Sequence, residues 1–164
     1  ILSRMNSGRD LAGNTLDART CFTISCAVNP LANDLDYEIE RLEKKVAEGC
    51  TIAFSQPLFE IDAVERFRKR IEHLPLRFML GVIPLRTIRH AEFLHYEVPG
   101  MNVPEHIRQR MRAHGASTET ASREGIEIAV EFMQHARSLS DGVYLMPPFK
   151  KYDMAVEILQ RIQT

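Results

Sequence analysis

The sequence predicts an α/β fold on a parallel sheet, either a layered fold or a (β/α) barrel. Four short apolar runs alternate with segments whose apolar residues recur at helical spacing. The runs are apolar almost throughout, as is typical of parallel strands covered by helices. A complete barrel needs eight strands and about 250 residues, whereas this chain has 164 residues. Four parallel strands alone leave two unpaired edges and an uncovered face, so we expect the chain to be half of a larger structure.

Each expected strand stops at or near a proline, which has no N–H to give to a sheet ladder. The loops that follow are polar and irregular, so the ends of the strands are where we expect a site. The expected strands are residues 22–28, 51–55, 77–83 and 142–146, and the prolines at their ends are Pro30, Pro57, Pro84 and Pro147.

The first expected helix has an apolar stripe, an aspartate to cap its start and a glycine to end it. The cap is Asp34 or Asp36, and Gly49 is the expected left-handed residue after the last turn. A capping box that begins at Asp62 is expected to open the next helix. The stripe of the first helix is Leu35, Ile39, Leu42 and Val46.

The remaining helices are expected after the third strand and after the fourth. Three lie between those strands, from about Thr87 to before Pro99, from Pro104 to about 113, and from Ser117 or Thr118 onward. Residues 1–20 are expected to be a loop and helix lead-in, without a dinucleotide-binding glycine motif. The last helix is expected to bury Ala155, Ile158, Leu159 and Ile162.

Composition argues against several classes of partner. A net charge of −1 gives no electrostatic basis for binding nucleic acid or an anionic membrane, and no apolar run reaches the length of a membrane span. Cys21, Cys26 and Cys50 have no CxxC spacing, which is typical of reduced thiols in a cytoplasmic protein. Neither cysteine nor histidine spacing predicts a metal site. The chain begins at Ile1 without a visible signal peptide, which fits a processed or partial chain.

Gln56 is the most informative single residue, because it ends an apolar run at the point where α/β proteins hold ligands. Its amide can donate and accept hydrogen bonds toward a heterocycle at the same time. The alternative is a buried glutamine that satisfies nearby backbone groups. The residue type and position alone leave both interpretations open.

Several motifs, in order and at matching separations, resemble the methylenetetrahydrofolate reductase family. The resemblance extends from about Gly13 to the C-terminal helix. It is carried by residues 42–49, 54–59, 81–85, 125–129 and 142–145. Within the family, the chain is most similar to bacterial bifunctional proteins, which join a homocysteine S-methyltransferase domain to the reductase. The residues that carry this similarity are Asn29, Pro30, 91–95 and 97–100.

This resemblance implies a (β/α)8 TIM barrel, of which residues 1–164 are one domain segment that supplies strands 5–8. The implied reaction passes hydride from NADH or NADPH through FAD to 5,10-methylenetetrahydrofolate and forms 5-methyltetrahydrofolate for methionine biosynthesis. It also implies a cytoplasmic homo-oligomer. The family's general-acid glutamate lies on the first strand and a flavin-tuning aspartate on the fourth, so we expect no catalytic residue here and no turnover by this chain alone.

The resemblance places five FAD-binding residues at the end of the first strand and on the next helix. Lys45 matches a lysine at the FAD phosphates, which need cationic donors. Glu38 stands where the family often has an aspartate at the ribose. The alternative is a solvated helix face whose lysines pair with nearby glutamates. The five residues are Asn29, Glu38, Arg41, Lys44 and Lys45.

Four residues match substrate-binding positions of the family. Gln56 matches a glutamine at the flavin face that contacts folate and nicotinamide in turn. His90 lies at a position near the folate, and Leu94 at a position against its aminobenzoate group. Lys151 matches a basic residue for the glutamate tail, and a cation beside a helix start favours a bound anion.

Two other functions stay open from the sequence. A barrel aldolase or lyase requires a Schiff-base lysine in an apolar pocket at a strand end, for which Lys150 and Lys151 are the candidates. A non-catalytic flavin- or folate-binding half would instead complete a site that another chain supplies.

Overall fold

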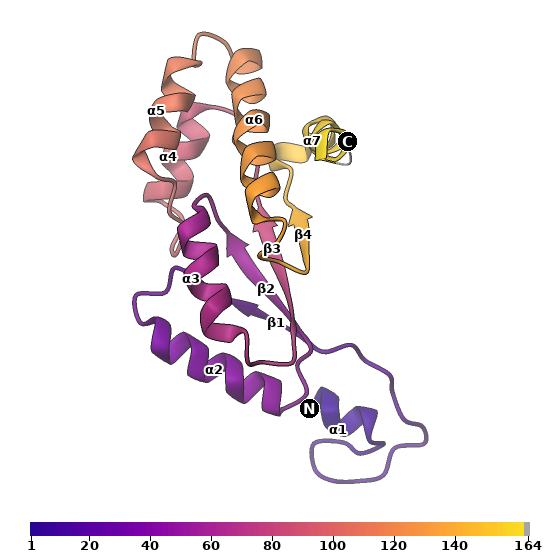
Figure 1. The fold of residues 1–164 in the computed structure, drawn as a ribbon. Helices are drawn as coiled ribbons and strands as arrows, with labels where there is room; N and C mark the ends of the chain where they lie inside the picture. Colours follow the sequence, from indigo (N-terminus) through magenta and orange to yellow (C-terminus); the bar gives the residue numbers. More distant parts are fainter. Residues whose placement is uncertain (163–164) are drawn as a thin grey trace.

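The computed structural model describes residues 1–162 and places a parallel four-stranded sheet at the centre of the molecule (Figure 1). Each strand pairs with the next one along the chain, in the order β1-β2-β3-β4. The α/β fold with a parallel sheet is therefore confirmed. The strands are β1 (Ser25–Val28), β2 (Ile52–Pro57), β3 (Arg77–Val82) and β4 (Gly142–Leu145).

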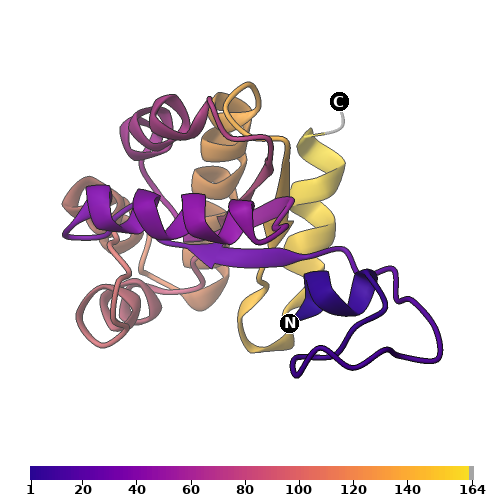
Figure 2. The ribbon, with the colours of Figure 1, turned by 90° about the horizontal axis from the view of Figure 1, so that it is seen from below.

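The first strand begins later than the expected residue 22, because the side chain of Asn6 binds the backbone there. Asn6 accepts a hydrogen bond from the N–H of Phe22 at 2.8 Å and donates one to its carbonyl at 2.9 Å. Phe22 therefore belongs to the lead-in, which carries the short helix α1 (Leu2–Asn6). This segment lies at the C-terminal end of α2 (Leu35–Ala47), where the Ser3 hydroxyl donates to the carbonyl of Glu48, and its loop extends away from the rest of the molecule (Figure 2).

The predicted helix ends are largely confirmed, with one correction. Asp34 accepts from the N–H of Tyr37 at the start of α2, and Ser117 forms a capping box at the start of α6. The capping box predicted at Asp62 is wrong: α3 begins at Ile61, whose side chain packs against the core and brings Asp62 into the first turn. Helices that follow the lead-in are α2 (Leu35–Ala47), α3 (Ile61–Ile71), α4 (Ile88–Tyr96), α5 (Glu105–Ala113), α6 (Thr118–Ala136) and α7 (Tyr152–Ile162), with a short 3-10 turn η1 (Pro148–Lys150) before α7.

The main core lies between the sheet and α2, α3, α6 and α7. Phe67 of α3 and Phe78 of β3 are both fully buried, with ring centroids 5.3 Å apart. From α7 the core receives Met154 and Ile158. The prediction that Leu159 is buried is wrong, since it is 42% exposed; α7 turns the Met154 and Ile158 side inward and leaves Leu159 on another face.

The opposite face of the sheet is only partly covered. Phe54 and Tyr144 meet edge to face there, with ring centroids 5.5 Å apart, and both are half-buried. Gly81 lies beneath the Tyr144 ring, where a Cβ would come within 2.7 Å of the phenol oxygen. Among the described strands, β1 and β4 each pair on one side only. One face and two edges are therefore open to further structure.

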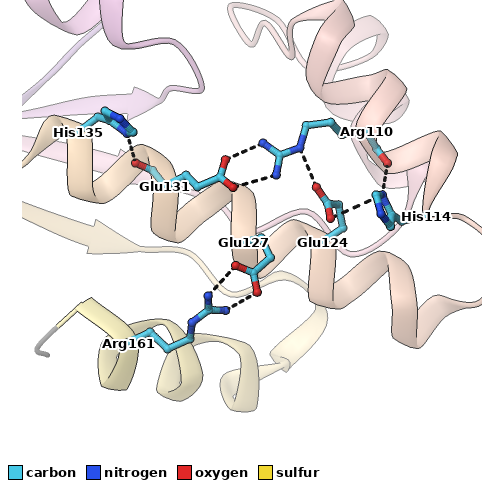
Figure 3. Close-up of polar contacts among 7 residues, drawn as sticks. All are labelled: Arg110, His114, Glu124, Glu127, Glu131, His135 and Arg161. Atoms are coloured by element: carbon cyan, nitrogen blue, oxygen red, sulfur yellow. Dashed lines mark hydrogen bonds and ion pairs between the residues drawn. The ribbon is translucent and has the colours of Figure 1, made fainter.

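A second apolar cluster joins α4, α5 and α6, and ion pairs bind the outer surfaces of α5, α6 and α7 together. The Arg110 guanidinium contacts Glu124 at 2.7 Å and Glu131 at 2.6 Å, while Arg161 of α7 contacts Glu127 at 2.6 Å (Figure 3). Within residues 1–162, none of the helices combines the length and the apolar character that crossing a bilayer requires.

We predict that Gly125→Ala destabilises the chain, although alanine ordinarily stabilises a helix interior. A Cβ at Gly125 would lie 1.7 Å from the carbonyl oxygen of Leu85, so α6 would have to move away from the loop after β3. We expect a loss of about 1–3 kcal/mol or more in the free energy of unfolding, measured by urea denaturation. Gln134→Ala, at an exposed position of the same helix, should change it by less than about 0.5 kcal/mol. Equal stability of both variants would contradict this packing.

We predict that Glu131→Gln lowers stability at neutral pH and that this difference fades in acid. Arg110 holds the pKa of Glu131 below its ordinary value of 4.5, chiefly through their hydrogen bonds. A carboxyl group whose pKa is lower in the folded protein stabilises the fold at pH values above its unfolded pKa. This stabilisation is lost as the pH falls through the folded pKa. Since the carboxylate is half exposed, we expect at most about 1 kcal/mol at pH 7. Thermal unfolding of wild type and Glu131→Gln at a series of acidic pH values measures the difference in stability. A difference that stays constant with pH would refute the explanation.

Candidate functional site

The site is organised by an irregularity at the end of β2. The pairing of β2 with β3 shifts register between Phe54 and Pro57, which places an extra residue in β2. The Ser55 hydroxyl accepts from the N–H of Gly81 at 2.9 Å and donates to the carbonyl of Gln56 at 2.7 Å. The Tyr144 hydroxyl donates to the carbonyl of Ser55. Side chains thus replace backbone hydrogen bonds at the bulge and hold Gln56 in place.

A cavity of about 300 Å³ opens at the carboxyl ends of β2, β3 and β4, and Gln56 is on its wall. Leu94, Val98 and Met101 make part of its apolar lining. The Gln56 Oε1 atom is buried and has no hydrogen-bond partner among the described residues. A buried acceptor without a partner costs about 1–3 kcal/mol, so a ligand donor that reached this oxygen would remove that cost. Two of the predicted substrate-binding residues, Gln56 and Leu94, are therefore brought together.

His90 lies one turn before Leu94 on α4 and is only 7% exposed. The N–H of Arg86 donates to His90 Nδ1 at 3.3 Å, so the neutral ring carries its proton on Nε2. Burial lowers the pKa of His90, and the positive charge of Arg86 lowers it further. The His90 ring meets Phe149 edge to face, with centroids 5.4 Å apart. His90 is thus neutral and buried, one turn of α4 away from the cavity residue Leu94.

Phe149, which was not among the residues predicted from the sequence, contacts both His90 and Arg86. Its side chain is 68% exposed, and the Arg86 guanidinium lies 5.7 Å from the centre of its ring. Phe149 and Lys150 have φ angles of 53° and 60°, in the left-handed region that non-glycine residues rarely adopt. Such backbone strain concentrates at functional sites. The available sequence signal was an aromatic residue directly after Pro147 and Pro148.

Lys151 lines a second cavity of about 410 Å³ between α6 and α7. Arg86 and Arg123 are also on its wall, and Arg123 pairs with Glu119 at 2.8 Å. Arg86 connects this cavity with the His90 and Phe149 rings. Lys150 and Lys151 are both exposed, so neither meets the requirement of a Schiff-base lysine for an apolar pocket.

Three of the predicted FAD-binding residues meet after β1. Glu38 accepts from the backbone N–H of Asn29 at 3.0 Å, and its other oxygen lies 3.4 Å from Arg41. The Asn29 side-chain oxygen accepts from the N–H of Leu31 at 2.9 Å. Glu38 therefore holds the turn between β1 and α2, and the Asn29 Nδ2 donor remains for another partner.

The two neighbouring lysines of α2 have different environments. The Lys45 ammonium donates to the carbonyl of Ala27 in β1 at 2.9 Å. Lys44 pairs with Glu40 at 2.6 Å, and its side chain is 68% exposed. Lys44 therefore lies on the solvated face of α2, whereas Lys45 reaches the backbone of β1.

Gly100, in the loop between α4 and α5, lies against the two amides at the strand ends. A Cβ at Gly100 would lie 3.0 Å from Gln56 Oε1 and 3.2 Å from Asn29 Nδ2. The predicted FAD-binding and substrate-binding sets therefore meet at Asn29 and Gln56. The sequence analysis did not single out Gly100 as a site residue.

Parallel βα units define the α/β class, in which ligands are ordinarily held at the carboxyl ends of the strands, where this cavity lies. The family model described as methylenetetrahydrofolate reductase matches residues 17–163, and the chain belongs to this family. The family prediction is therefore confirmed.

One similar solved structure is described as an uncharacterized protein from Clostridium thermocellum that binds two copies of 5-methyl-5,6,7,8-tetrahydrofolic acid. It is 12% identical to this chain with a TM-score of 0.53, and the match covers 90% of this chain and 54% of that one. The likeness shows a shared fold, and this chain spans about half the length of that protein. No curated protein sequence matches the chain.

We predict that Ser55→Ala destabilises the fold through the bulge. The change leaves the buried N–H of Gly81 without its acceptor, which should lower the free energy of unfolding by about 1–3 kcal/mol. Urea denaturation measures the difference. Ser140→Ala removes a hydroxyl with a weaker 3.4 Å contact to the Ala136 carbonyl and should change stability by less than about 0.5 kcal/mol. A Ser55→Ala variant no less stable than Ser140→Ala would show that the hydroxyl does not support the bulge.

Proposed function

We propose that this chain forms strands 5–8 of a methylenetetrahydrofolate reductase barrel. In the longer protein, NADH or NADPH reduces 5,10-methylenetetrahydrofolate to 5-methyltetrahydrofolate through FAD. Family membership over residues 17–163 supports the reaction, and the unpaired edges of β1 and β4 support a half-barrel. The observation that carries the site is the buried, unpartnered Gln56 Oε1 in an apolar cavity.

A folate molecule matches, part by part, the side chains that extend from Gln56 to Arg86 and Lys151. Gln56 offers an amide to the donor and acceptor groups of the pterin heterocycle. Leu94, His90 and Phe149 offer apolar and aromatic contact to the aminobenzoate. Arg86 and Lys151 offer positive charge to the glutamate carboxylates. The folate bound by the Clostridium thermocellum protein supports the same ligand class for this chain.

The donors at the end of β1 suit FAD in part. The Lys45 ammonium is held by a carbonyl rather than a carboxylate, which leaves its charge for a diphosphate. Asn29 Nδ2 and Glu38 are suited to hydroxyl groups, whereas Lys44 is neutralised by Glu40. Bound there, FAD supplies the hydride carrier. The residues of this chain bind the cofactor and the folate and orient them toward each other.

The proton-transfer chemistry is proposed to come from the other half of the barrel. We propose the general-acid glutamate and the flavin-tuning aspartate for strands 1 and 4, which this chain does not supply. The longer protein is proposed to be a cytoplasmic homo-oligomer, with a homocysteine S-methyltransferase domain as in its bifunctional relatives. This chain is therefore the binding half of the proposed enzyme.

Isothermal titration of the chain with 5-methyltetrahydrofolate tests the proposal. Gln56→Ala should weaken binding by roughly tenfold, since losing a hydrogen bond to a buried amide costs about 1.4 kcal/mol. Gln109→Ala removes an amide that binds Glu105 on the exposed face of α5 and should leave the affinity unchanged. Absence of folate binding, or equal affinities for all three proteins, would overturn the folate site. NADH-dependent turnover by the chain alone would overturn the assignment of the general acid to the other half.

A further inference from the structure

We propose that Asn29 and Gln56 form one two-amide subsite and that the loop of residues 97–101 is a lid that occupies it when no ligand is bound. The subsite would take a ligand group that carries one hydrogen-bond acceptor and one donor side by side, as a lactam or carboxamide does. The inference deepens the proposed function and rests on it only for the choice of folate as the binding probe.

The sheet register brings the two amides together. Val28 of β1 pairs with Ser55 of β2, so Asn29 and Gln56 follow at neighbouring positions where these strands end. The N–H of Leu31 engages the Asn29 oxygen and so fixes Nδ2 as the remaining donor. Gln56 presents Oε1 as a buried acceptor without a partner. The pair therefore offers one donor and one acceptor.

Gly100 covers this pair without satisfying it. Its φ of +78° favours glycine, and a Cβ would come within 3.0 Å of Gln56 Oε1 and 3.2 Å of Asn29 Nδ2. Gln56 Oε1 is buried from solvent beneath this glycine, and a Cα–H group gives it no ordinary hydrogen bond. The closed loop thus leaves a polar atom dry and unpaired, and a ligand N–H in its place would remove that penalty.

Hydrogen bonds hold the loop at its ends, while its middle is held by the apolar contacts of Val98 and Met101 with the second cluster. Glu97 N–H donates to the carbonyl of Phe93 at 2.9 Å, and Val103 N–H donates to His95 Nδ1 at 3.3 Å. Between these anchors, within the described chain, the backbone hydrogen bond is the 3.2 Å contact from Met101 N–H to the Val98 carbonyl, inside the loop itself. Pro99 has no N–H to contribute. Pro99 and Gly100 are exposed, so this tip can lift when the apolar contacts of Val98 and Met101 loosen, while both ends stay in place.

A closed lid lowers apparent ligand affinity, because the ligand binds only the fraction of molecules that are open. Gly100→Ala adds a methyl group against both amides and should shift the population toward the open state. Gly13→Ala is the matched control: Gly13 also has a positive φ, of 93°, but a Cβ there would have no neighbour within 4 Å. Backbone strain affects both variants, whereas the collision affects only Gly100→Ala.

Hydrogen–deuterium exchange of the ligand-free chain tests the lid directly. Amides of residues 97–103 should exchange at least several-fold faster in Gly100→Ala than in wild type or Gly13→Ala, with α5 unchanged. In the double variant Gln56→Ala/Gly100→Ala, the increase relative to Gln56→Ala should be smaller, because one collision partner is gone. Unchanged exchange in Gly100→Ala would overturn the lid.

Titration with 5-methyltetrahydrofolate supplies the second arm. Gly100→Ala should bind it roughly fivefold more tightly than wild type, because less of the protein is closed, while Gly13→Ala should bind like wild type. Faster loop exchange together with equal or weaker binding would show that the loop is a wall of the site, and would overturn the proposal. If neither wild type nor variant binds folate, the proposed function fails, and the exchange result still decides whether the loop covers the amides as a lid.

Discussion

The arrangement of the strand ends depends on the two hydrogen bonds of the Ser55 hydroxyl. A bulge adds a residue to β2 and so removes regular ladder partners from β2 and β3. Ser55 binds the N–H of Gly81 and the carbonyl of Gln56, and Tyr144 from β4 binds the carbonyl of Ser55. One short polar side chain and one phenol therefore connect three strands. The tyrosine ring fits over β3 only because residue 81 is glycine.

The two faces of the sheet differ in how complete they are. On the helix-covered face, Phe67, Phe78 and Ile158 are fully buried. On the other face, Phe54 and Tyr144 remain half-buried and pack mainly on each other. Parallel sheets are ordinarily covered on both faces, which favours further strands that close around this side. The cavity beside Gln56 lies at the carboxyl ends of these strands, so in the proposed barrel the strands that complete the sheet would also add to the wall of the site.

Local signals predicted most of the fold, and contacts between distant segments account for most of what the sequence analysis missed. The caps at Asp34 and Ser117 follow from nearby residue types, and the position of Gln56 follows from the end of an apolar run. The left-handed φ of Phe149 has no local glycine signal. The contact of Gly100 with Gln56 joins residues far apart in the chain. Lys44 and Lys45 are adjacent in sequence but about 100° apart around a helix, and packing decides which one faces β1.

The position of Lys45 also bears on the open edge of β1. Backbone carbonyls alternate in direction along a strand. The Ile24 carbonyl accepts from the N–H of Thr51 and so points toward β2. The Ala27 carbonyl, three residues later, therefore points toward the free edge of the sheet. An unpaired edge is a template on which other chains add strands and grow into fibres. The Lys45 ammonium occupies an acceptor that such a strand would need and adds a charge beside it. In the proposed barrel this edge pairs with a further strand, and that pairing requires the Lys45 ammonium to leave the Ala27 carbonyl, which frees its charge for a diphosphate.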